Sequence, residues 1–501
     1  MGAKAIQVCG TGSGVGKSVI VAGLCRIFLQ DGFKVAPFKA QNMSLNSFVT
    51  REGGEIGRAQ AMQAEACRLE PSVDMNPVLL KPTSDTGSQV ILRGKPVGNM
   101  SAVKYKGYKG RAGAEALRSF KRLKSDFEII VIEGAGSPAE VNLKSHDIVN
   151  MKMAAAAGAP VILVGDIDRG GVFAWLIGTL DLLTKSEQKM VKGFIINKFR
   201  GDKRLLKSGI DFLEKRTGIE ILGVIPYFKD IKIPEEDSVA LEERRPAAGD
   251  GRQGAKKVDI AVIKLPYTSN FTDFDALESE ADVRLRYISD SDGLNGANVI
   301  IIPGTKNTIK DLIWLRRSGL AAKILSALDS KPQAVLIGIC GGYQMLGRVI
   351  YDSEKVESSL TEIEGLGLLP IGTAFGPEKV LSQTEAVEIG TGIELEGYEI
   401  HHGRTVNLEA CDPVFKIRDQ KRTDGTRIEN GRIWGTYLHG VFDNAVFRRN
   451  FLNEARGRIG LGPLPAGDGR FKLDDELDKL AELVRGNIDM KLLYKILDHR
   501  Q

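Results

Sequence analysis

The sequence predicts an α/β protein with two α/β domains, the first of them built around a parallel sheet. Three observations predict this class. Short apolar runs alternate with longer amphipathic stretches, a polar segment interrupts this alternation once, and 501 residues are too many for a single hydrophobic core. Hydrophobic residues make up 43% of the chain and charged residues 27%, which excludes a disordered protein.

The first predicted domain covers residues 1–243. Six short apolar runs predict strands that are buried on both faces, because they show no polar alternation. The amphipathic stretch Lys17–Leu29 predicts a helix between the first two strands, so a parallel sheet with crossover helices is the simplest architecture. The apolar runs cover residues 5–10, 34–39, 128–135, 160–167, 193–198 and 221–227.

A polar segment separates this domain from the second one. Residues 244–257, RRPAAGDGRQGAKK, lack apolar periodicity and predict a linker. A second α/β domain is expected over 258–447, followed by a helical tail over 448–501 whose apolar stripe packs on a core. The apolar runs of the second domain cover residues 258–266, 282–289, 298–304 and 334–340, with strand-like segments near 386–404 and 432–439. The stripe of the tail consists of Leu473, Leu477, Leu480 and Val484.

Charge, hydropathy and cysteine content restrict the class of partner. The formal net charge of +5 is too small on this length to indicate nucleic acid or an anionic membrane. The longest nearly apolar run, Met153–Val164, is too short to span a bilayer, and the N-terminus has no signal-peptide pattern. Five scattered cysteines without a CxxC pair predict neither a disulfide framework nor a thiolate zinc site. We expect a cytoplasmic protein with small-molecule ligands, and its oligomeric state is left open.

The loop after the first predicted strand has the pattern of a phosphate-binding loop. Residues 10–18 read GTGSGVGKS and lie between a strand and a helix. Glycines there let backbone N–H groups approach phosphate oxygens, while the lysine reaches the terminal phosphates and the serine can ligate Mg²⁺. An ordinary glycine-rich turn is the alternative, which the coincidence of strand, loop, Lys-Ser pair and helix disfavours. The expected ATP contacts are Thr11, Gly12, Gly14, Gly16, Lys17 and Ser18.

Thr11 stands where the strict P-loop pattern has glycine, and this variant resembles the dethiobiotin synthetase-like branch of P-loop proteins. Many members of that branch phosphorylate a substrate carboxylate. Partition ATPases carry a signature lysine at the position of Gly12, so a dimerising switch ATPase is disfavoured. The resemblance implies that Glu133 in EGAG ligates Mg²⁺ and that Asn197 in IINK reads adenine.

Each of these polar positions also has a structural interpretation. Glu133 could be a helix cap or a salt-bridge partner, and Asn197 could be a turn residue. Asp166 and Asp168 lie at another strand end, and their roles are left open. Three further residues follow the second strand and are interpreted as contacts to the substrate carboxylate or the transferred phosphate: Lys39, Gln41 and Asn42.

The second domain contains a candidate nucleophile. In AVLIGICGGYQMLG, an apolar strand leads through GxCxG into a helix, which is the nucleophile-elbow layout. The helix N-terminus favours a reactive thiolate, so Cys340 is the predicted nucleophile. The remaining cysteines are expected to be small buried or incidental residues: Cys9, Cys25, Cys67 and Cys411.

His439 is the predicted base, because it ends the strand-like segment IWGTYLHG about 100 residues downstream. The order of GICGGYQ, GYEIHHGRT and GTYLHG resembles the class I glutamine amidotransferase domain, in which the cysteine attacks glutamine and releases ammonia. The resemblance implies an oxyanion hole from Gly304 and Gly341. That family usually has a Glu two residues beyond the histidine, but the position is Val441 here, and Asp443 is a conceivable substitute.

A glutaminase and a carboxylate-activating ATP site in one chain indicate an ATP-dependent, glutamine-using amidoligase. The whole chain resembles the cobyric acid synthase family, most specifically over 37–47, 55–67 and 75–82. The resemblance implies Mg-ATP, glutamine as co-substrate, and amidation of the b, d, e and g carboxylates of a corrinoid, adenosylcobyrinic acid a,c-diamide. Arg93 and the basic run 104–111 are candidate contacts to its anionic arms, with a solvated basic loop as the alternative.

Three other functions are weighed against this one. A cobyrinic acid a,c-diamide synthase-like amidoligase also combines an ATP-dependent domain with a glutaminase domain. A regulatory P-loop nucleotide-binding protein with a degenerate glutaminase module belongs to another class, and the presence of Cys340 and His439 counts against it. A stand-alone thiol hydrolase is the third, and an ATP requirement for amide formation would exclude it. The order of the amidations and the ammonia path cannot be read from the sequence.

Overall fold

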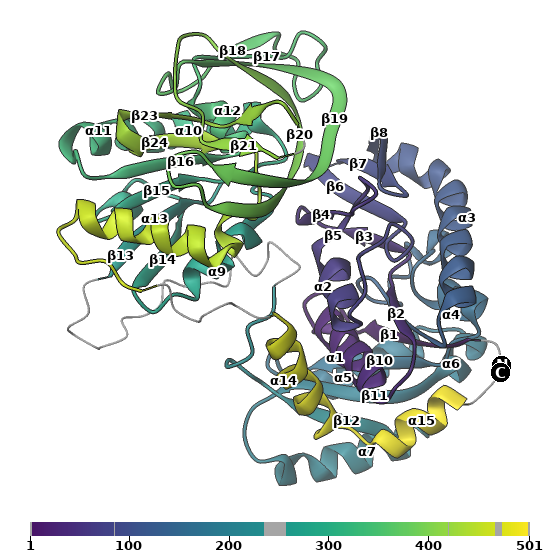
Figure 1. Ribbon diagram of the computed structural model, residues 1–501. Helices are drawn as coiled ribbons and strands as arrows, with labels where there is room; N and C mark the ends of the chain where they lie inside the picture. The colour runs from purple at the N-terminus through teal and green to yellow at the C-terminus, as the bar shows by residue number, and fades with distance from the viewer. Residues whose placement is uncertain (1–2, 85, 235–256, 419, 466–472, 499–501) are drawn as a thin grey trace. The chain divides into compact units, whose positions relative to one another are not determined.

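The computed structural model describes residues 3–84, 86–234, 257–418, 420–465 and 473–498, and the chain forms two compact units (Figure 1). The first unit comprises residues 1–44, 54–236 and 472–501, and the second comprises 45–53 and 237–471. The predicted linker, 244–257, lies outside the described residues except for its last residue. The units differ from contiguous domains in two places: residues 45–53 belong to the second unit, and the last two helices belong to the first.

The first unit contains a six-stranded sheet in which all neighbouring strands are parallel, as predicted. The strand order is β12-β11-β10-β1-β9-β2, so β1 is central and the loop that follows it opens in the middle of the carboxyl edge. The strands are β1 (Lys4–Gly10), β2 (Val35–Phe38), β9 (Ile129–Glu133), β10 (Val161–Asp166), β11 (Val191–Phe199) and β12 (Ile221–Pro226).

Helices cover both faces of this sheet, because alternate strand residues are buried in separate clusters. One face packs against α1 (Lys17–Gln30), α2 (Arg58–Ala66), α14 (Leu473–Arg485) and α15 (Met490–Asp498). Leu477, Leu480 and Val484 of α14 are buried there, so the predicted stripe of the tail does pack on a core. The other face packs mainly against α3 (Ala102–Asp126), α4 (Met151–Ala157), α5 (Val172–Asp181), α6 (Lys185–Met190) and α7 (Lys207–Thr217).

The first unit also has a small four-stranded sheet that was not predicted. Its order is β3-β6-β7-β8, with a parallel β3–β6 pair and two antiparallel pairs. Much of β8 is exposed, so it lacks the continuous apolar run that identified the central strands. The strands are β3 (Gln41–Met43), β6 (Val78–Ser84), β7 (Gly87–Leu92) and β8 (Lys95–Ser101), and the short β5 (Glu55–Gly57) precedes α2.

The second unit has its own six-stranded sheet in the order β14-β13-β15-β16-β24-β23. It is parallel except for the edge strand β23. The strands are β13 (Val258–Ile263), β14 (Val283–Ile288), β15 (Val299–Ile302), β16 (Val335–Ile339), β23 (Thr426–Ile428) and β24 (Ile433–Thr436). The α-helices are α9 (Asp275–Glu278), α10 (Thr308–Arg317), α11 (Leu320–Ser330), α12 (Gly341–Leu346) and α13 (Ala445–Arg458).

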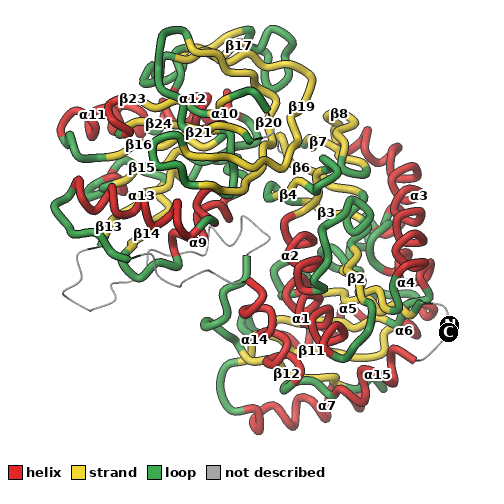
Figure 2. Tube along the Cα trace, viewed as in Figure 1, coloured by secondary structure: helices red, strands yellow, loops and turns green. Residues whose placement is uncertain are grey.

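A long antiparallel pair forms the centre of a further sheet in this unit (Figure 2). Its strands are β19 (Ile371–Glu388) and β20 (Glu394–Asn407), and the pair begins well before the strand-like segment expected near 386–404. The sheet is completed by β17 (Val349–Tyr351), β18 (Glu362–Glu364), β21 (Phe415–Ile417) and β22 (Thr423–Asp424), and β4 (Ser47–Val49) contacts β19 and β20. Across the described residues, no helix has the length and apolar content that crossing a membrane requires.

Candidate functional site

Cys340 occupies a sharp turn between β16 and α12, as the elbow pattern predicted. Its backbone φ of 52° and ψ of −107° lie where side chains are strained. The flanking glycines permit this turn, because a Cβ at Gly342 would lie 1.9 Å from the carbonyl oxygen of Ile302. The GxCxG spacing therefore reflects the close approach of two backbone segments as well as the nucleophile itself.

His439 reaches this turn from the neighbouring strand, since β24 pairs with β16 in the sheet. A Cβ placed on Gly304 would lie 3.0 Å from His439 Cε1 and 3.7 Å from Cys340 Cβ, so these three residues meet at one point. Gly341 lies against the same loop, with Thr305 N 3.2 Å from the position of its missing Cβ. The structure thus brings together the predicted nucleophile, the predicted base and both predicted oxyanion-hole glycines.

Asp273 is the residue of this site that sequence reasoning missed. Its Oδ2 lies 2.6 Å from His439 Nδ1, and its Oδ1 accepts a hydrogen bond from Gly440 N at 3.2 Å. Burial lowers the pKa of His439, but the charge of Asp273, its hydrogen bond to the ring and the interactions with Cys340 together raise that pKa to about 10. Asp273 is therefore the carboxylate bonded to the His439 ring, the role for which Asp443 was the candidate from the sequence. The sequence feature that could have pointed to Asp273 is the polar run YTSNFTDFD, which follows the buried strand β13.

Residues 45–53 support the turn that carries Asp273. Asn270 has a left-handed backbone with φ of 53°, and its Oδ1 accepts a hydrogen bond from Ser47 N at 3.0 Å. In return, Phe271 N donates to Asn46 Oδ1 at 3.2 Å. Val49 packs in a small cluster with Tyr398 of β20. This second half of the PFKAQNMSLNS motif therefore helps to build the glutaminase site.

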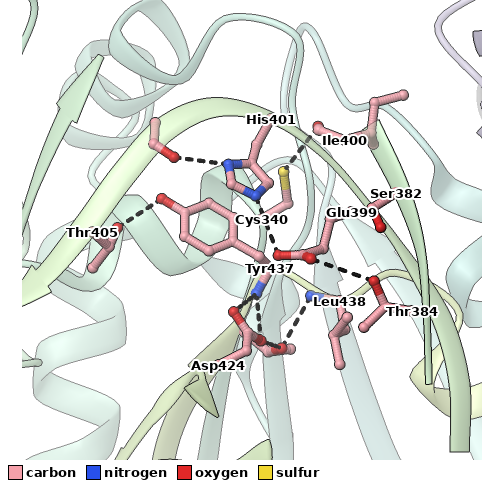
Figure 3. A network of polar contacts seen from close by, with 12 residues as sticks. Cys340, Ser382, Thr384, Glu399, Ile400, His401, Thr405, Asp424, Tyr437 and Leu438 are labelled. Atoms are coloured by element: carbon pink, nitrogen blue, oxygen red, sulfur yellow. Dashed lines mark hydrogen bonds and ion pairs between the residues drawn. The ribbon is translucent and has the colours of Figure 1, made fainter. Parts of the chain in front are cut away.

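Strand β20 contacts both members of the Cys–His pair. Cys340 Sγ donates to the carbonyl oxygen of Ile400 at 3.7 Å, and the ring of Tyr398 stacks on His439 at 5.1 Å between centroids. The His401 ring stacks on Tyr437 at 3.7 Å, with its Nδ1 2.8 Å from the carbonyl oxygen of Gly403 (Figure 3). His401 therefore lies in a second polar network beside the nucleophile.

Two buried carboxylates complete this network (Figure 3). Glu399 pairs with Arg422 and lies 3.5 Å from His401 Nε2. Burial opposes its ionisation, but hydrogen bonds from His401 and Arg422 lower the pKa of Glu399 to about 2. Asp424 accepts hydrogen bonds from Thr436 Oγ1 and Tyr437 N, and burial raises its pKa to about 6. Asp424 thus anchors the end of β24, directly before His439.

In the first unit, the phosphate-binding loop is shaped by glycine and held by Asn197. Gly14 and Gly16 have φ of 69° and 96°, a region that glycine adopts at low cost. A Cβ at Gly16 would lie 2.2 Å from Asn197 Nδ2, which donates to the carbonyl oxygen of Val15 at 2.9 Å. Lys17 Nζ donates to the carbonyl oxygens of Gly12 and Gly136, at 2.7 and 3.1 Å.

Glu133 ends the buried strand β9 beside this loop and accepts four side-chain donors. Ser18 Oγ lies 2.9 Å and Lys39 Nζ 2.7 Å from its Oε1. Its Oε2 accepts from Gln63 at 2.6 Å and Gln60 at 3.3 Å, both from α2 and both absent from the predicted set. A hydroxyl and a carboxylate oxygen this close are ligands of the kind Mg²⁺ prefers, so the residues fit a Mg²⁺ ion.

The other predicted substrate contacts form hydrogen bonds or ion pairs with neighbouring side chains. Asn42 Nδ2 donates to Gln60 Oε1 at 2.9 Å, and Gln41 Oε1 accepts from Tyr105 at 2.5 Å. The basic run 104–111 forms part of helix α3, and it is not the basic loop that was the alternative. At the carboxyl edge of the central sheet, Asp166 pairs with Lys198 at 2.9 Å and Asp168 with Arg200 at 2.6 Å. In the turn between β7 and β8, Arg93 Nε is 3.9 Å from Asp74.

Each unit matches the model of a known protein family. Residues 6–240 match the CobQ/CobB/MinD/ParA nucleotide binding domain, and residues 259–447 match the CobB/CobQ-like glutamine amidotransferase domain. A nucleotide-binding loop in one unit and a Cys–His–Asp arrangement in the other define a glutamine-hydrolysing ligase.

Full-length relatives define the class more narrowly. Cobyric acid synthases of Dehalococcoides mccartyi (strain CBDB1) and Syntrophobacter fumaroxidans are 50% and 48% identical to this chain, each over 99% of both chains. The bifunctional protein CobDQ of Leptospira interrogans is 48% identical over 98% of this chain and 56% of its own. The chain belongs to the cobyric acid synthase family, whose members act in cobalamin biosynthesis.

Proposed function

We propose that this enzyme amidates the b, d, e and g carboxylates of adenosylcobyrinic acid a,c-diamide to give adenosylcobyric acid. Each amidation uses one glutamine and one ATP. The observation that carries the proposal is the presence, in one chain of this family, of the Cys340–His439–Asp273 arrangement and a P-loop with Glu133 beside it. The first supplies ammonia and the second activates the carboxylate that ammonia attacks.

In the glutaminase reaction, the Cys340 thiolate attacks the side-chain amide carbon of glutamine. Backbone N–H groups of Gly304 and Gly341 stabilise the oxyanion that forms. His439 gives a proton to the departing nitrogen, so ammonia leaves and a thioester remains, which water then hydrolyses to glutamate. Asp273 orients the His439 ring and keeps Nε2 toward the reaction, an atom that is buried without a hydrogen-bond partner among the described residues.

In the ligase reaction, backbone N–H groups of residues 11–16 and the Lys17 ammonium bind the phosphates of ATP. Ser18 and Glu133 would hold Mg²⁺, which screens the charge of the phosphates. The substrate carboxylate attacks the γ-phosphorus and ADP leaves, which gives an acyl phosphate. Ammonia attacks the acyl carbon, phosphate departs, and a carboxamide is formed.

The two reactions are assigned to different parts of the chain. We assign carboxylate activation to residues 1–243, glutamine hydrolysis to 258–447, and no reaction step to the tail, 448–501. Asn197 is the proposed adenine contact, and Lys39, Gln41 and Asn42 are proposed to contact the substrate or the transferred phosphate. A cytoplasmic location is proposed because ATP and glutamine are abundant there.

Mass spectrometry of the corrinoid tests the proposal. The enzyme is incubated with adenosylcobyrinic acid a,c-diamide, glutamine and Mg-ATP. Replacement of OH by NH₂ lowers the mass by about 1 Da per amidation, so four ATP-dependent steps are expected. Glutaminase and ATPase activity without any mass change would contradict this substrate. Conversion of cobyrinic acid to its a,c-diamide would instead identify the rival amidoligase.

A further inference from the structure

A cavity of about 530 Å³ lies beside the phosphate-binding loop of the first unit. One wall is formed by the loop itself, through Thr11, Gly12 and Ser13. Helix α5 contributes another part of the lining, which includes Trp175, and Arg169 also lines the cavity. The assignments above use the loop residues for ATP, but they do not use α5, Trp175 or Arg169.

The cavity lies along the phosphate-binding loop, where the phosphates of a nucleotide belong. A P-loop lysine reaches the β- and γ-phosphates, and Lys17 Nζ is bonded to the carbonyl oxygen of Gly12, a cavity residue. Asn197, the proposed adenine contact, packs on Gly16 and is not among the described residues that line the cavity. Asn197 donates to the carbonyl oxygen of Val15, which also lines the cavity, so a group that fills the cavity borders the phosphate-binding loop and meets the phosphates bound there.

The two walls differ in chemistry. On α5, the small residues Ala174 and Gly178 flank Trp175, whose indole is 41% exposed and thus available for contact. On the loop side, Thr11 Oγ1 is buried and lacks a hydrogen-bond partner within the described part of the chain. A buried hydroxyl without a partner is costly, so this wall is suited to a ligand with polar atoms. The cavity fits a molecule that has an apolar body and a polar end directed at the loop.

The charges along the rim are mixed. Asp166 is 1% exposed and paired with Lys198 at 2.9 Å, so its charge is balanced within the protein. Arg169 contributes a guanidinium, which pairs well with carboxylates, whereas Glu140 contributes the opposite charge. An anionic arm therefore has a favourable partner at the Arg169 side.

We propose that this cavity binds the phosphoryl acceptor, with Trp175 packed against its apolar body and Arg169 facing one of its carboxylate arms. The inference rests on the proposed function, because a corrinoid polycarboxylate combines these two features. It adds a binding surface on α5 to the contacts expected from Lys39, Gln41 and Asn42. Trp175 and Arg169 are specificity-determining residues in this assignment.

The test measures corrinoid and ATP binding separately. Equilibrium dialysis of adenosylcobyrinic acid a,c-diamide against the full-length enzyme without ATP gives the corrinoid Kd, and titration with Mg-ATP gives the ATP Kd. Loss of an aromatic packing contact predicts that Trp175→Ala raises the corrinoid Kd about tenfold, with Trp175→Phe close to wild type. Arg169→Gln is expected to raise it as well. Phe212→Ala is the matched control, because Phe212 is an aromatic residue of the same unit, 58% exposed on α7 and outside the cavity.

Three results would overturn the inference, and they are distinguishable. Equal corrinoid Kd values for wild type and Trp175→Ala would show that α5 does not bind the corrinoid. The proposed function would stand. A raised ATP Kd in Trp175→Ala with an unchanged corrinoid Kd would assign the cavity to the nucleotide base. No corrinoid binding by the wild-type enzyme would refute the proposed function and the inference together.

Discussion

At the scale of single residues, the reactivity of His439 depends on a carboxylate that is 166 positions away in the chain. Asp273 is 4% exposed and His439 1%, so water does not screen their interaction. The ion pair is favourable only because Gly440 N satisfies the second oxygen of Asp273 at 3.2 Å. Removal of the carboxylate would therefore change both the protonation and the orientation of the histidine.

Asp273→Asn is expected to lower glutaminase kcat by about 100-fold, the usual contribution of an oriented general acid or base. Asp273 and Cys340 together raise the pKa of His439 to about 10, and loss of the carboxylate lowers that pKa, so the alkaline limb of the pH–rate profile should move to lower pH in the variant. A glutaminase assay across pH measures both effects. Asp443→Asn is the control, and equal losses in the two variants would contradict the assignment.

Asp273→Asn is also expected to change how the free energy of unfolding depends on pH. A group whose pKa is raised by folding stabilises the native state fully below its unfolded value, 6.5, and loses that contribution as pH rises toward the folded value, about 10. The difference in free energy of unfolding between wild type and Asp273→Asn should thus be largest below pH 6.5 and shrink up to pH 10. A pH-independent difference would show that the pair does not titrate in this way.

At the scale of elements, helix α14 is separated from α1 by more than 440 residues yet packs directly on it. Leu480 is fully buried in the cluster that contains α1, and Arg26 of α1 pairs with Asp474 at 2.6 Å. Helix α1 also carries Lys17 and Ser18. Helix α14 therefore supports the helix that begins at the phosphate-binding loop.

Leu480→Ala is expected to destabilise the first unit by about 2–5 kcal/mol, the range for a buried leucine that leaves a cavity. Urea unfolding measures this loss of stability. Trp175 fluorescence monitors the unfolding of the first unit, in a protein in which Trp314 and Trp434 have been replaced by Phe. Leu205→Ala, at a position 81% exposed, is the control and should change the midpoint little. A similar small change in both variants would contradict the packing role of α14.

At the scale of the whole molecule, the two reactions are assigned to different units, and ammonia is the only product that links them. This separation predicts distinct phenotypes for the two sites. Cys340→Ala should abolish glutamine-dependent amidation and retain amidation with high ammonia, because only ammonia production is lost. Amide formation followed by mass spectrometry with each nitrogen source measures this, and loss of both activities would contradict separate sites.

Lys17→Ala supplies the reciprocal control. It should remove amidation with either nitrogen source, because the phosphates lose a cation, while Cys340 can still be alkylated by iodoacetamide. Retained amidation in this variant would contradict the assignment of the phosphate-binding loop.

Patterns that depend on neighbouring residues could be read from the sequence. Both central sheets, the phosphate-binding loop and the turn at Cys340 were predicted, because each is encoded by a contiguous run of apolar residues or glycines whose backbone requirements are local. The strands β3, β6, β7 and β8 were missed, since the apolar runs of β6 and β7 are only three residues long and much of β8 is exposed. The pairing of α14 with α1 was likewise visible only as an apolar stripe without a partner.

The sequence by itself determined the two α/β folds, and it predicted the nucleophile, its base and the nucleotide-binding residues next to the lysine. Only the tertiary structure decided that Asp273 completes the Cys–His pair, that Gln60 and Gln63 surround Glu133, and that residues 45–53 belong with the second unit. The physical reason is the same in each case. Hydrogen bonds and charge pairs act over a few ångströms, and folding brings together within that range residues whose distance along the chain leaves no periodic signal.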